Sequence, residues 1–349
     1  MPAPVPQHPG KAGLTLALLA LAVMLGAVFS GALGFLRVPF CDALRVYGAA
    51  LLGQQPAGID AATVSVLMSV RLPRILSALL VGGSLALCGA VFQALLLNPL
   101  ADPYTLGIST GAAFGASLVI VLQILGFALP TAVSVPVFAF LGGMATLALV
   151  LYLATGDSRL SSTSLILSGV IVSAILSAAI GFCKFLADEQ VGLIIFWLMG
   201  SLAGASWSQL AGLAPVTLLG ALLLCAFGRD LNIMAMGDRA AASLGVATKR
   251  LRLGLVALCS LLTALAVSVS GVIGFVGLIV PHLLRQLLGP DNRLLLPASF
   301  LAGALLLLLA DTLTRAVLPS EVPIGVLTAL LGGPFFCFLF KKRQRHGGL

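Results

Sequence analysis

Long apolar runs, separated by short polar stretches, dominate this sequence. Candidate spans lie at residues 14–36, 72–97, 105–125, 131–154, 164–186, 209–227, 251–270, 274–288, 293–316 and 322–340. A membrane-spanning helix needs roughly 20 apolar residues, and only helices and closed barrels satisfy their own backbone groups in lipid. The alternating strands of a barrel are absent from the sequence. We therefore predict an all-α polytopic membrane protein with about ten transmembrane helices.

The composition excludes an ordinary soluble domain. Hydrophobic residues make up 60% of the 349 residues and charged residues 9%, whereas soluble domains are roughly a quarter charged. The six cysteines are dispersed and form no CxxC pair, so we expect neither a metal site nor a cofactor. A net charge of +8 could suit nucleic acid. In a membrane protein, however, basic residues set the topology, and we expect no nucleic-acid partner.

Ten spans would place both termini on the same side of the membrane. If that side is the cytoplasm, the basic residues outside are Arg37, Arg45, Arg71, Arg74, Lys184 and Arg315. The other 13 of the 19 lysines and arginines then lie inside, as positive-inside topology requires. We predict a multi-pass protein of the cytoplasmic (inner) membrane with a cytoplasmic N-terminal tail (1–13), a transmembrane domain (14–340) and a basic cytoplasmic tail (341–349).

Several apolar segments need a separate interpretation. The first window is about 23 residues long, longer than the apolar region of a typical signal peptide, so we expect a retained span. The window at 274–288 is short and rich in Gly and Pro, so its depth in the membrane stays open. Residues 194–202 suit an interfacial or re-entrant helix, because Trp197 and Trp207 favour the membrane–water boundary.

Glycine repeats predict places where helices pack closely. Gly107, Gly111 and Gly115 form a GxxxGxxxG row, and Gly200 and Gly204 repeat the spacing. Small residues at this spacing let helix backbones approach each other in lipid. We therefore expect tightly packed seams in a multi-helix bundle.

Enzymatic chemistry finds little support in the sequence. GISTG around Ser109 matches GxSxG, but that pattern needs a strand-to-helix turn and a histidine base, and His282 has no plausible partner acid. The sequence contains no HExxH and no GxxxxGK[ST] motif. We predict no catalytic residue, so any ATP hydrolysis must come from another subunit. A secondary transporter or channel stays open as an alternative, although acidic residues at mid-membrane are scarce.

Three long strings resemble the FecCD family of membrane subunits from type II ABC importers. They are RLPRILSALLVGGSLALCGAVFQALLLNPLADP at 71–103, GFVGLIVPHLLRQLLGPDNRLLLPAS at 274–299, and ADTLTR with SEVPIGVLTALLGGPFF between 310 and 336. The resemblance implies a type II importer permease fold and a twenty-helix dimer of two copies in membrane lipid. It also implies two cytoplasmic ATP-binding subunits and an extracytoplasmic substrate-binding protein. The family's usual cargo is a ferric siderophore, haem or cobalamin, and we expect an iron chelate.

The resemblance implies that Arg71, Arg74 and Arg315 dock the binding protein on the outside. A guanidinium meets a carboxylate through two parallel hydrogen bonds, which suits an arginine for this task. Two alternatives stay open. Arg71 and Arg74 could anchor a helix at the interface, and Asp311 and Arg315 could form an i,i+4 pair that eases helix insertion.

The same resemblance implies a cytoplasmic gate formed by Asn98, Leu100, Ser162 and Thr163. Asn98 and Leu100 lie in the NPLADP turn between the second and third windows. Ser161, Ser162 and Thr163 could instead simply cap the fifth helix.

The polar stretch at 229–250 interrupts the apolar pattern on the predicted cytoplasmic side. Gly237 and Asp238 offer an N-cap, and Gly245 offers a stop for a helix of about two turns. Such a helix is too short to stand alone. By resemblance it couples the permease to the ATPase through Asp238, Arg239, Ala241, Leu244 and Gly245, and Arg239 occupies a position where glutamate is common. A solvated loop helix is the alternative.

Overall fold

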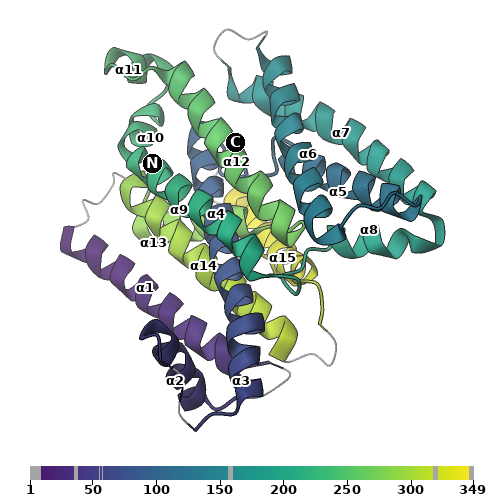
Figure 1. Cartoon of the computed structure of the whole chain (residues 1–349). Helices are drawn as coiled ribbons and strands as arrows, with labels where there is room; N and C mark the ends of the chain where they lie inside the picture. Colours follow the sequence, from purple (N-terminus) through teal and green to yellow (C-terminus); the bar gives the residue numbers. More distant parts are fainter. Residues whose placement is uncertain are drawn as a thin grey trace.

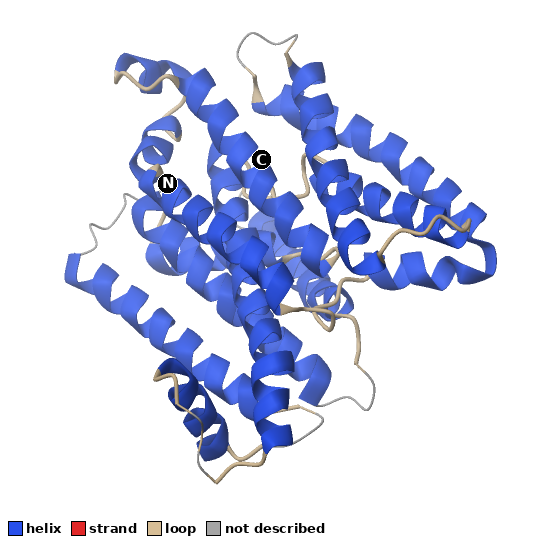
Figure 2. Cartoon of the chain, in the orientation of Figure 1, coloured by secondary structure: helices blue, strands red, loops and turns tan. Residues whose placement is uncertain are grey.

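The computed structural model describes residues 9–34, 38–54, 56, 58–155, 160–316 and 321–345. Throughout these ranges the regular elements are helices, and no strand occurs in them (Figure 2). The predicted all-α class is confirmed. Predictions that concern Arg37, Arg159 and the chain ends 1–8 and 346–349 lie outside the described residues.

The described chain forms fifteen α-helices, one π-helical segment and one 3-10 turn. In chain order they are α1 (Pro9–Ala32), α2 (Phe40–Leu51), α3 (Ala61–Ser65), η1 (Val66–Arg71), α4 (Leu72–Leu95), α5 (Ile108–Ile124), α6 (Thr131–Ala154), α7 (Ser162–Ala187), η2 (Asp188–Gln190), α8 (Val191–Leu198), α9 (Trp207–Ala226), α10 (Gly228–Met234), α11 (Asp238–Ser243), α12 (Thr248–Ser270), α13 (Val276–Leu288), α14 (Asn292–Ala316) and α15 (Ile324–Arg345).

Each of the ten predicted windows coincides with a helix. Seven helical stretches of the described chain are long and apolar enough to cross a membrane, and α5, α13 and the apolar part of α15 are shorter. One span, Ala61–Leu95, joins α3, η1 and α4 into 35 continuous residues. The ten predicted spans therefore correspond to helices α1, α4, α5, α6, α7, α9, α12, α13, α14 and α15.

Helix α4 forms the centre of the bundle (Figure 1). It packs against α14, α13, α12 and α9, and 83% of its apolar window is buried. Glycines make this contact possible. A Cβ on Gly82 would collide with the carbonyl of Gly303, and one on Gly89 would collide with the carbonyl of Gly277. The backbones of α4, α13 and α14 thus touch directly, as small-residue packing in lipid predicts.

A second glycine seam joins α5 to α6, and it confirms part of the sequence prediction. A Cβ on Gly111 would meet the carbonyl of Gly142, and one on Gly115 would overlap the carbonyl of Phe138. The prediction for Gly200 and Gly204 is wrong. Both lie in the loop between α8 and α9, where Gly200 has a φ of +71°, so their spacing forms no helix seam.

The short eighth window is a helix that follows a non-helical segment. The chain leaves α12 at Gly271 (φ +68°) and enters α13 after Phe275 (φ +69°), so residues 271–275 are not helical. A side chain of the protein supplies a hydrogen-bond partner for this non-helical backbone. The Tyr104 hydroxyl donates a hydrogen bond to the Ile273 carbonyl at 2.6 Å. Non-helical backbone is tolerated at membrane depth where protein surrounds it, which accounts for the length of only 13 residues in α13.

Helices α2 and α3 were not predicted from the sequence, and they lie beside the end of α1 (Figure 1). Helix α2 buries Ala43 and Val46 in a small cluster with Ala32 and Leu67. Asp60 caps α3 by accepting a hydrogen bond from the Ala62 amide at 2.9 Å. These short helices lie at the end of the bundle that was predicted to face outside.

Candidate functional site

Polar side chains gather at the end of the bundle where α1 and α14 end and α4 begins. Arg71 ends η1, Arg74 lies in the first turn of α4, and Arg315 lies in the last turn of α14. These are the three arginines that the sequence predicts for docking. Because α4 and α14 are packed antiparallel neighbours, the fold brings residues more than 230 positions apart into one cluster.

A fully buried carboxylate, Asp311, holds two of these arginines. Arg74 Nε donates to Asp311 Oδ1 at 2.9 Å, and Arg315 Nε donates to Asp311 Oδ2 at 3.2 Å. The side chain of Asp311 is 0% exposed. The i,i+4 pairing proposed from the sequence is therefore present, and it forms part of a larger network that includes Arg74.

The end of α1 supplies backbone acceptors for the remaining guanidinium groups. Arg315 Nη1 donates to the Leu33 carbonyl at 2.6 Å, and Arg71 Nη1 donates to the Gly31 carbonyl. Gly34 lies against both side chains, because a Cβ there would be 3.0 Å from Arg71 Nη2 and 3.1 Å from Arg315 Nη1. Helix α1 thus helps to neutralise the cluster through its carbonyl groups.

The three arginines are buried, and Glu321 forms the exposed part of the cluster. Arg71, Arg74 and Arg315 are 6%, 8% and 8% exposed, whereas the Glu321 side chain is 51% exposed. Arg74 Nη1 donates to both Glu321 oxygens, at 3.1 and 3.0 Å. Sequence reasoning missed Glu321, although it lies within the SEVPIG string, because a single acidic residue between helices carries no periodic signal.

The opposite end of the bundle carries α11, the helix of the predicted coupling segment. It begins after Gly237 (φ +98°) and ends before Gly245 (φ +83°). The Gly245 amide donates to the Ala242 carbonyl at 3.0 Å, and the Val246 amide donates to the Ala241 carbonyl at 3.1 Å. This pair of bonds is a Schellman motif, so the predicted stop at Gly245 is confirmed.

Asp238 fixes the start of α11 to α12. Its carboxylate accepts a hydrogen bond from Arg252 Nη2 at 2.8 Å, and Arg252 is only 5% exposed. Ala241 is fully buried, whereas Leu244 is 60% exposed and Arg239 is also exposed. The segment is therefore a docked helix with one exposed edge, and Arg252 is a positioning residue that the sequence analysis did not identify.

The residues predicted for the gate lie in two separate segments at this same end. Asn98 and Leu100 belong to the loop between α4 and α5, where the Asn98 side-chain oxygen accepts from the Leu100 amide at 3.0 Å. Leu100 is 42% exposed. Ser162 and Thr163 begin α7, and the cap is Ser161, whose hydroxyl accepts from the Ser164 amide at 3.2 Å. Ser162 and Thr163 are thus not needed for the cap.

The α4–α5 loop has a half-buried acidic residue of its own. Asp102 accepts hydrogen bonds from the Thr105 hydroxyl at 2.8 Å and the Tyr104 amide at 3.1 Å. Burial raises the pKa of the Asp102 carboxyl, and these hydrogen bonds oppose that rise. The loop is therefore held by internal bonds, and Leu100 is presented from a fixed turn.

The structure does not assemble a hydrolase site around Ser109. This serine lies in the first turn of α5 and is 5% exposed, on a helix and not at a strand-to-helix turn. His282 lies on α13 with its Nε2 2.8 Å from the Gln286 amide. Within the described residues, no group of three or more His, Cys, Asp or Glu side chains could hold a metal ion.

These features define a multi-pass helical membrane protein with a polar cluster at each end of the bundle. The profile of the FecCD transport family matches residues 14–342. The chain belongs to this family. It is an ABC transporter permease subunit, and permeases of this family act in complexes whose ATPase activity lies in partner subunits.

Relatives of known description support this membership. The uncharacterized ABC transporter permease YvrB of Bacillus subtilis is 40% identical over 333 residues, which cover 94% of this chain and 92% of YvrB. The hemin transport permease HmuU of Yersinia pestis is 42% identical over 288 residues, which cover 80% of this chain and 85% of HmuU. A solved structure described as an inward-facing, metal-chelate type ABC transporter is 36% identical to this chain, with a TM-score of 0.81. The match covers 94% of this chain and 98% of the solved chain.

Proposed function

We propose that this chain is the transmembrane subunit of an ATP-driven importer that moves a metal chelate across the cytoplasmic membrane. A ferric siderophore is the first candidate cargo, and haem and cobalamin are the next. The observation that carries the proposal is the likeness over 94% of the chain to a metal-chelate type transporter. Relatives named for hemin, cobalamin and ferric citrate support the same cargo class.

The importer works as a homodimer with two cytoplasmic ATP-binding subunits and an extracytoplasmic binding protein. ATP binding and hydrolysis on the partners switch the two copies between outward- and inward-facing states, and the chelate passes along the dimer axis. Both termini of each copy lie in the cytoplasm. The excess of basic residues at the α11 end, where Lys249, Arg250 and Arg252 begin α12, supports this orientation.

Arg71, Arg74 and Arg315 dock the binding protein through its carboxylates. The supporting observation is that the fold gathers all three guanidinium groups at one end of α4 and α14. In the single chain, Arg74 donates hydrogen bonds to the Glu321 carboxylate. A carboxylate of the binding protein must therefore replace Glu321 as the partner of Arg74. The arginines then exchange one acidic partner for another, which limits the cost of uncovering a buried charge.

At the cytoplasmic end, α11 seats in the ATPase, and the exposed Leu244 and Arg239 make the contact. The buried Ala241 and the Asp238–Arg252 pair transmit the position of α11 to α12, because they fix it to the bundle. Asn98, Leu100, Ser162 and Thr163 close the pathway near the dimer axis. Leu100 supports this role because a fixed turn presents its exposed side chain.

The cargo proposal is tested with the cognate binding protein of this permease. The purified protein is exposed to a panel of ferric siderophores, haem, cobalamin and metal-free solutes, and the ligand that it retains is measured by titration. The complex with the permease is then formed with the loaded and the empty binding protein. Retention of one metal chelate supports the proposal, whereas retention of only metal-free solutes contradicts it.

A further inference from the structure

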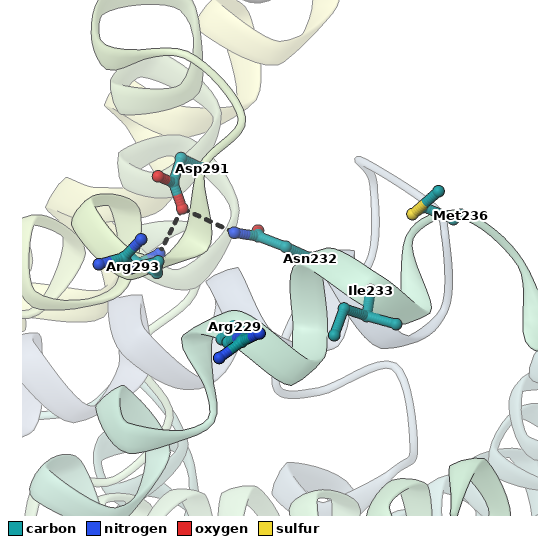
Figure 3. Close-up of a pocket in the computed structure, with 6 residues that line it drawn as sticks. All are labelled: Arg229, Asn232, Ile233, Met236, Asp291 and Arg293. Carbon is teal, nitrogen blue, oxygen red and sulfur yellow. Dashed lines mark hydrogen bonds between the residues drawn. The ribbon is translucent and has the colours of Figure 1, made fainter. Parts of the chain in front are cut away.

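A cavity of about 420 Å³ opens between α10 and the turn that leads from α13 into α14 (Figure 3). Its lining is formed by Arg229, Asn232, Ile233, Met236, Asp291 and Arg293. Figure 3 shows the two facing elements with the hydrogen bond from Asn232 to Asp291 between them. None of these residues is among those predicted to contact the ATPase, to form the gate or to dock the binding protein, although the four on the α10 side lie at the start of the polar stretch 229–250.

The cavity has two basic side chains with no acidic partner. Among the described residues, neither the Arg229 nor the Arg293 guanidinium has an ion pair or a hydrogen bond. The one carboxylate of the lining, Asp291, accepts from Asn232 Nδ2 at 2.7 Å and from the Arg293 backbone amide at 3.0 Å. Asp291 therefore caps α14, and both guanidinium groups stay available to an external anion.

The cavity lies at the level where the membrane spans end. Arg229 follows the candidate span Trp207–Ala226 by three residues, and Arg293 is the second residue of the span Asn292–Ala316. Both arginines are exposed. This depth is where lipid head groups meet a membrane protein, and anionic lipids are attracted to basic residues there.

Exposed apolar side chains lie on the two helices that precede the walls of the cavity in the chain. Helix α9, just before Arg229, exposes Leu219, Leu222 and Leu223 by 63%, 70% and 52%. Helix α13, which ends just before Asp291, exposes Leu287 by 75%. A ligand with a phosphate for the arginines and acyl chains for these leucines would match both parts of the surface.

We infer that this cavity binds the head group of an anionic phospholipid, such as phosphatidylglycerol, with Arg229 and Arg293 on its phosphate. Guanidinium groups bind phosphate oxygens through paired hydrogen bonds, and a basic pocket between helices at the membrane surface suits an anionic head group. The lipid joins α10 to α14 across the cavity. It thereby supports the segment that leads into α11.

The test titrates the full-length permease, in a neutral detergent, with phosphatidylglycerol or phosphatidylcholine and counts bound lipid by native mass spectrometry. The double variant Arg229→Gln/Arg293→Gln is compared with Arg250→Gln, which removes an exposed charge at the same end outside the cavity. We expect the wild type and Arg250→Gln to prefer phosphatidylglycerol by about fivefold or more. The double variant should lose that preference and keep its melting temperature in phosphatidylcholine.

Three outcomes would overturn the inference. An unchanged preference in the double variant would place the lipid elsewhere. Displacement of the lipid by inorganic phosphate at equal concentration would show a site for the free anion. A double variant that keeps its lipid preference but loses ATPase binding would show a protein contact. Because lipid binding is measured on the permease alone, its failure leaves the proposed importer function untouched.

Discussion

Arg74 on α4 donates to the fully buried Asp311 on α14 at 2.9 Å, and this bond joins the two most closely packed helices of the bundle. The same carboxylate also holds Arg315. Two arginines proposed to receive an external protein are thus held in place by a shared internal anion. Asp311 fixes the positions of Arg74 and Arg315, whereas the arginines supply the charges for docking. Substitution of Asp311 and substitution of the arginines should therefore have different effects on stability and docking.

Removing the central carboxylate should destabilise the permease strongly. Asp311→Ala leaves Arg74 and Arg315 as buried cations with no common anion, and the loss of one partner of a buried ion pair costs about 3–5 kcal/mol. We expect a clear fall in melting temperature in detergent. The triple variant Arg74→Met/Asp311→Leu/Arg315→Met, which removes all three charges, should recover much of the loss. Equal instability of both variants would contradict the account of the network.

The triple variant also separates folding from docking. It should fold and enter the membrane, but it should bind the extracytoplasmic binding protein at least tenfold more weakly, since one desolvated charged contact is worth about 1.5–3 kcal/mol. Charge reversal at Arg71 should weaken binding and reduce its salt dependence as well. A binding assay in nanodiscs measures both effects. Unchanged affinity in the folded variants would refute docking through these arginines.

Removing Glu321 should have the opposite effect on docking. In Glu321→Gln, the neutral amide competes less well for Arg74 than the carboxylate does, so the binding protein should associate about two- to tenfold more tightly. Glu189→Gln is the matched control. Glu189 is exposed and lies in η2, just after the end of α7 that is predicted to face outside. Weaker association of Glu321→Gln than of the control would show that Glu321 itself contacts the partner.

Two substitutions at the cytoplasmic end should disconnect the ATPase by different routes. Leu244→Arg changes an exposed side chain, so the permease should keep its melting temperature but lose ATPase assembly. Asp238→Lys removes the partner of the buried Arg252, so it should lower both stability and coupled ATP hydrolysis. Normal assembly and stimulation of ATP hydrolysis in both variants would exclude α11 as the coupling helix.

The glycine seams give a prediction for the fold itself. Gly89→Ala should lower the stability of the permease by about 1–3 kcal/mol, because the new methyl group would overlap the Gly277 carbonyl and the helices would have to separate. Gly212→Ala is the control, since nothing lies within 4 Å of its Cβ position. Thermal unfolding in detergent measures the difference, and equal stability would contradict direct backbone contact.

Much of the fold could be predicted because lipid restricts the chain to a few arrangements. Apolar length alone located the ten helices that match the predicted windows. Gly111 and Gly115 correctly indicated the close contact between α5 and α6. Gly200 and Gly204 have the same spacing but lie in a loop. Spacing can indicate a shared helix face only if both residues are helical, and the break after Leu198 was not evident from the sequence.

The site was predicted less completely, for a physical reason. The sequence resemblance identified Arg74 and Arg315, but the bond from Arg74 to Asp311 spans 237 positions and depends on how α4 packs against α14. The sequence also did not indicate Glu321, a single acidic residue between helices, or the pairing of Arg252 with Asp238, which depends on how α11 lies against α12. Local patterns, such as the Schellman stop at Gly245, could be predicted, whereas pairs that form only through tertiary packing could not.

Transport by the reconstituted complex tests whether this chain works as the permease of an ATP-driven importer. Proteoliposomes contain the permease either alone or with its ATPase subunits, and both preparations receive the binding protein loaded with radiolabelled chelate. The account predicts uptake only when the ATPase subunits and ATP are present together. Equal uptake by the permease alone, driven by an ion gradient or by diffusion, would contradict it.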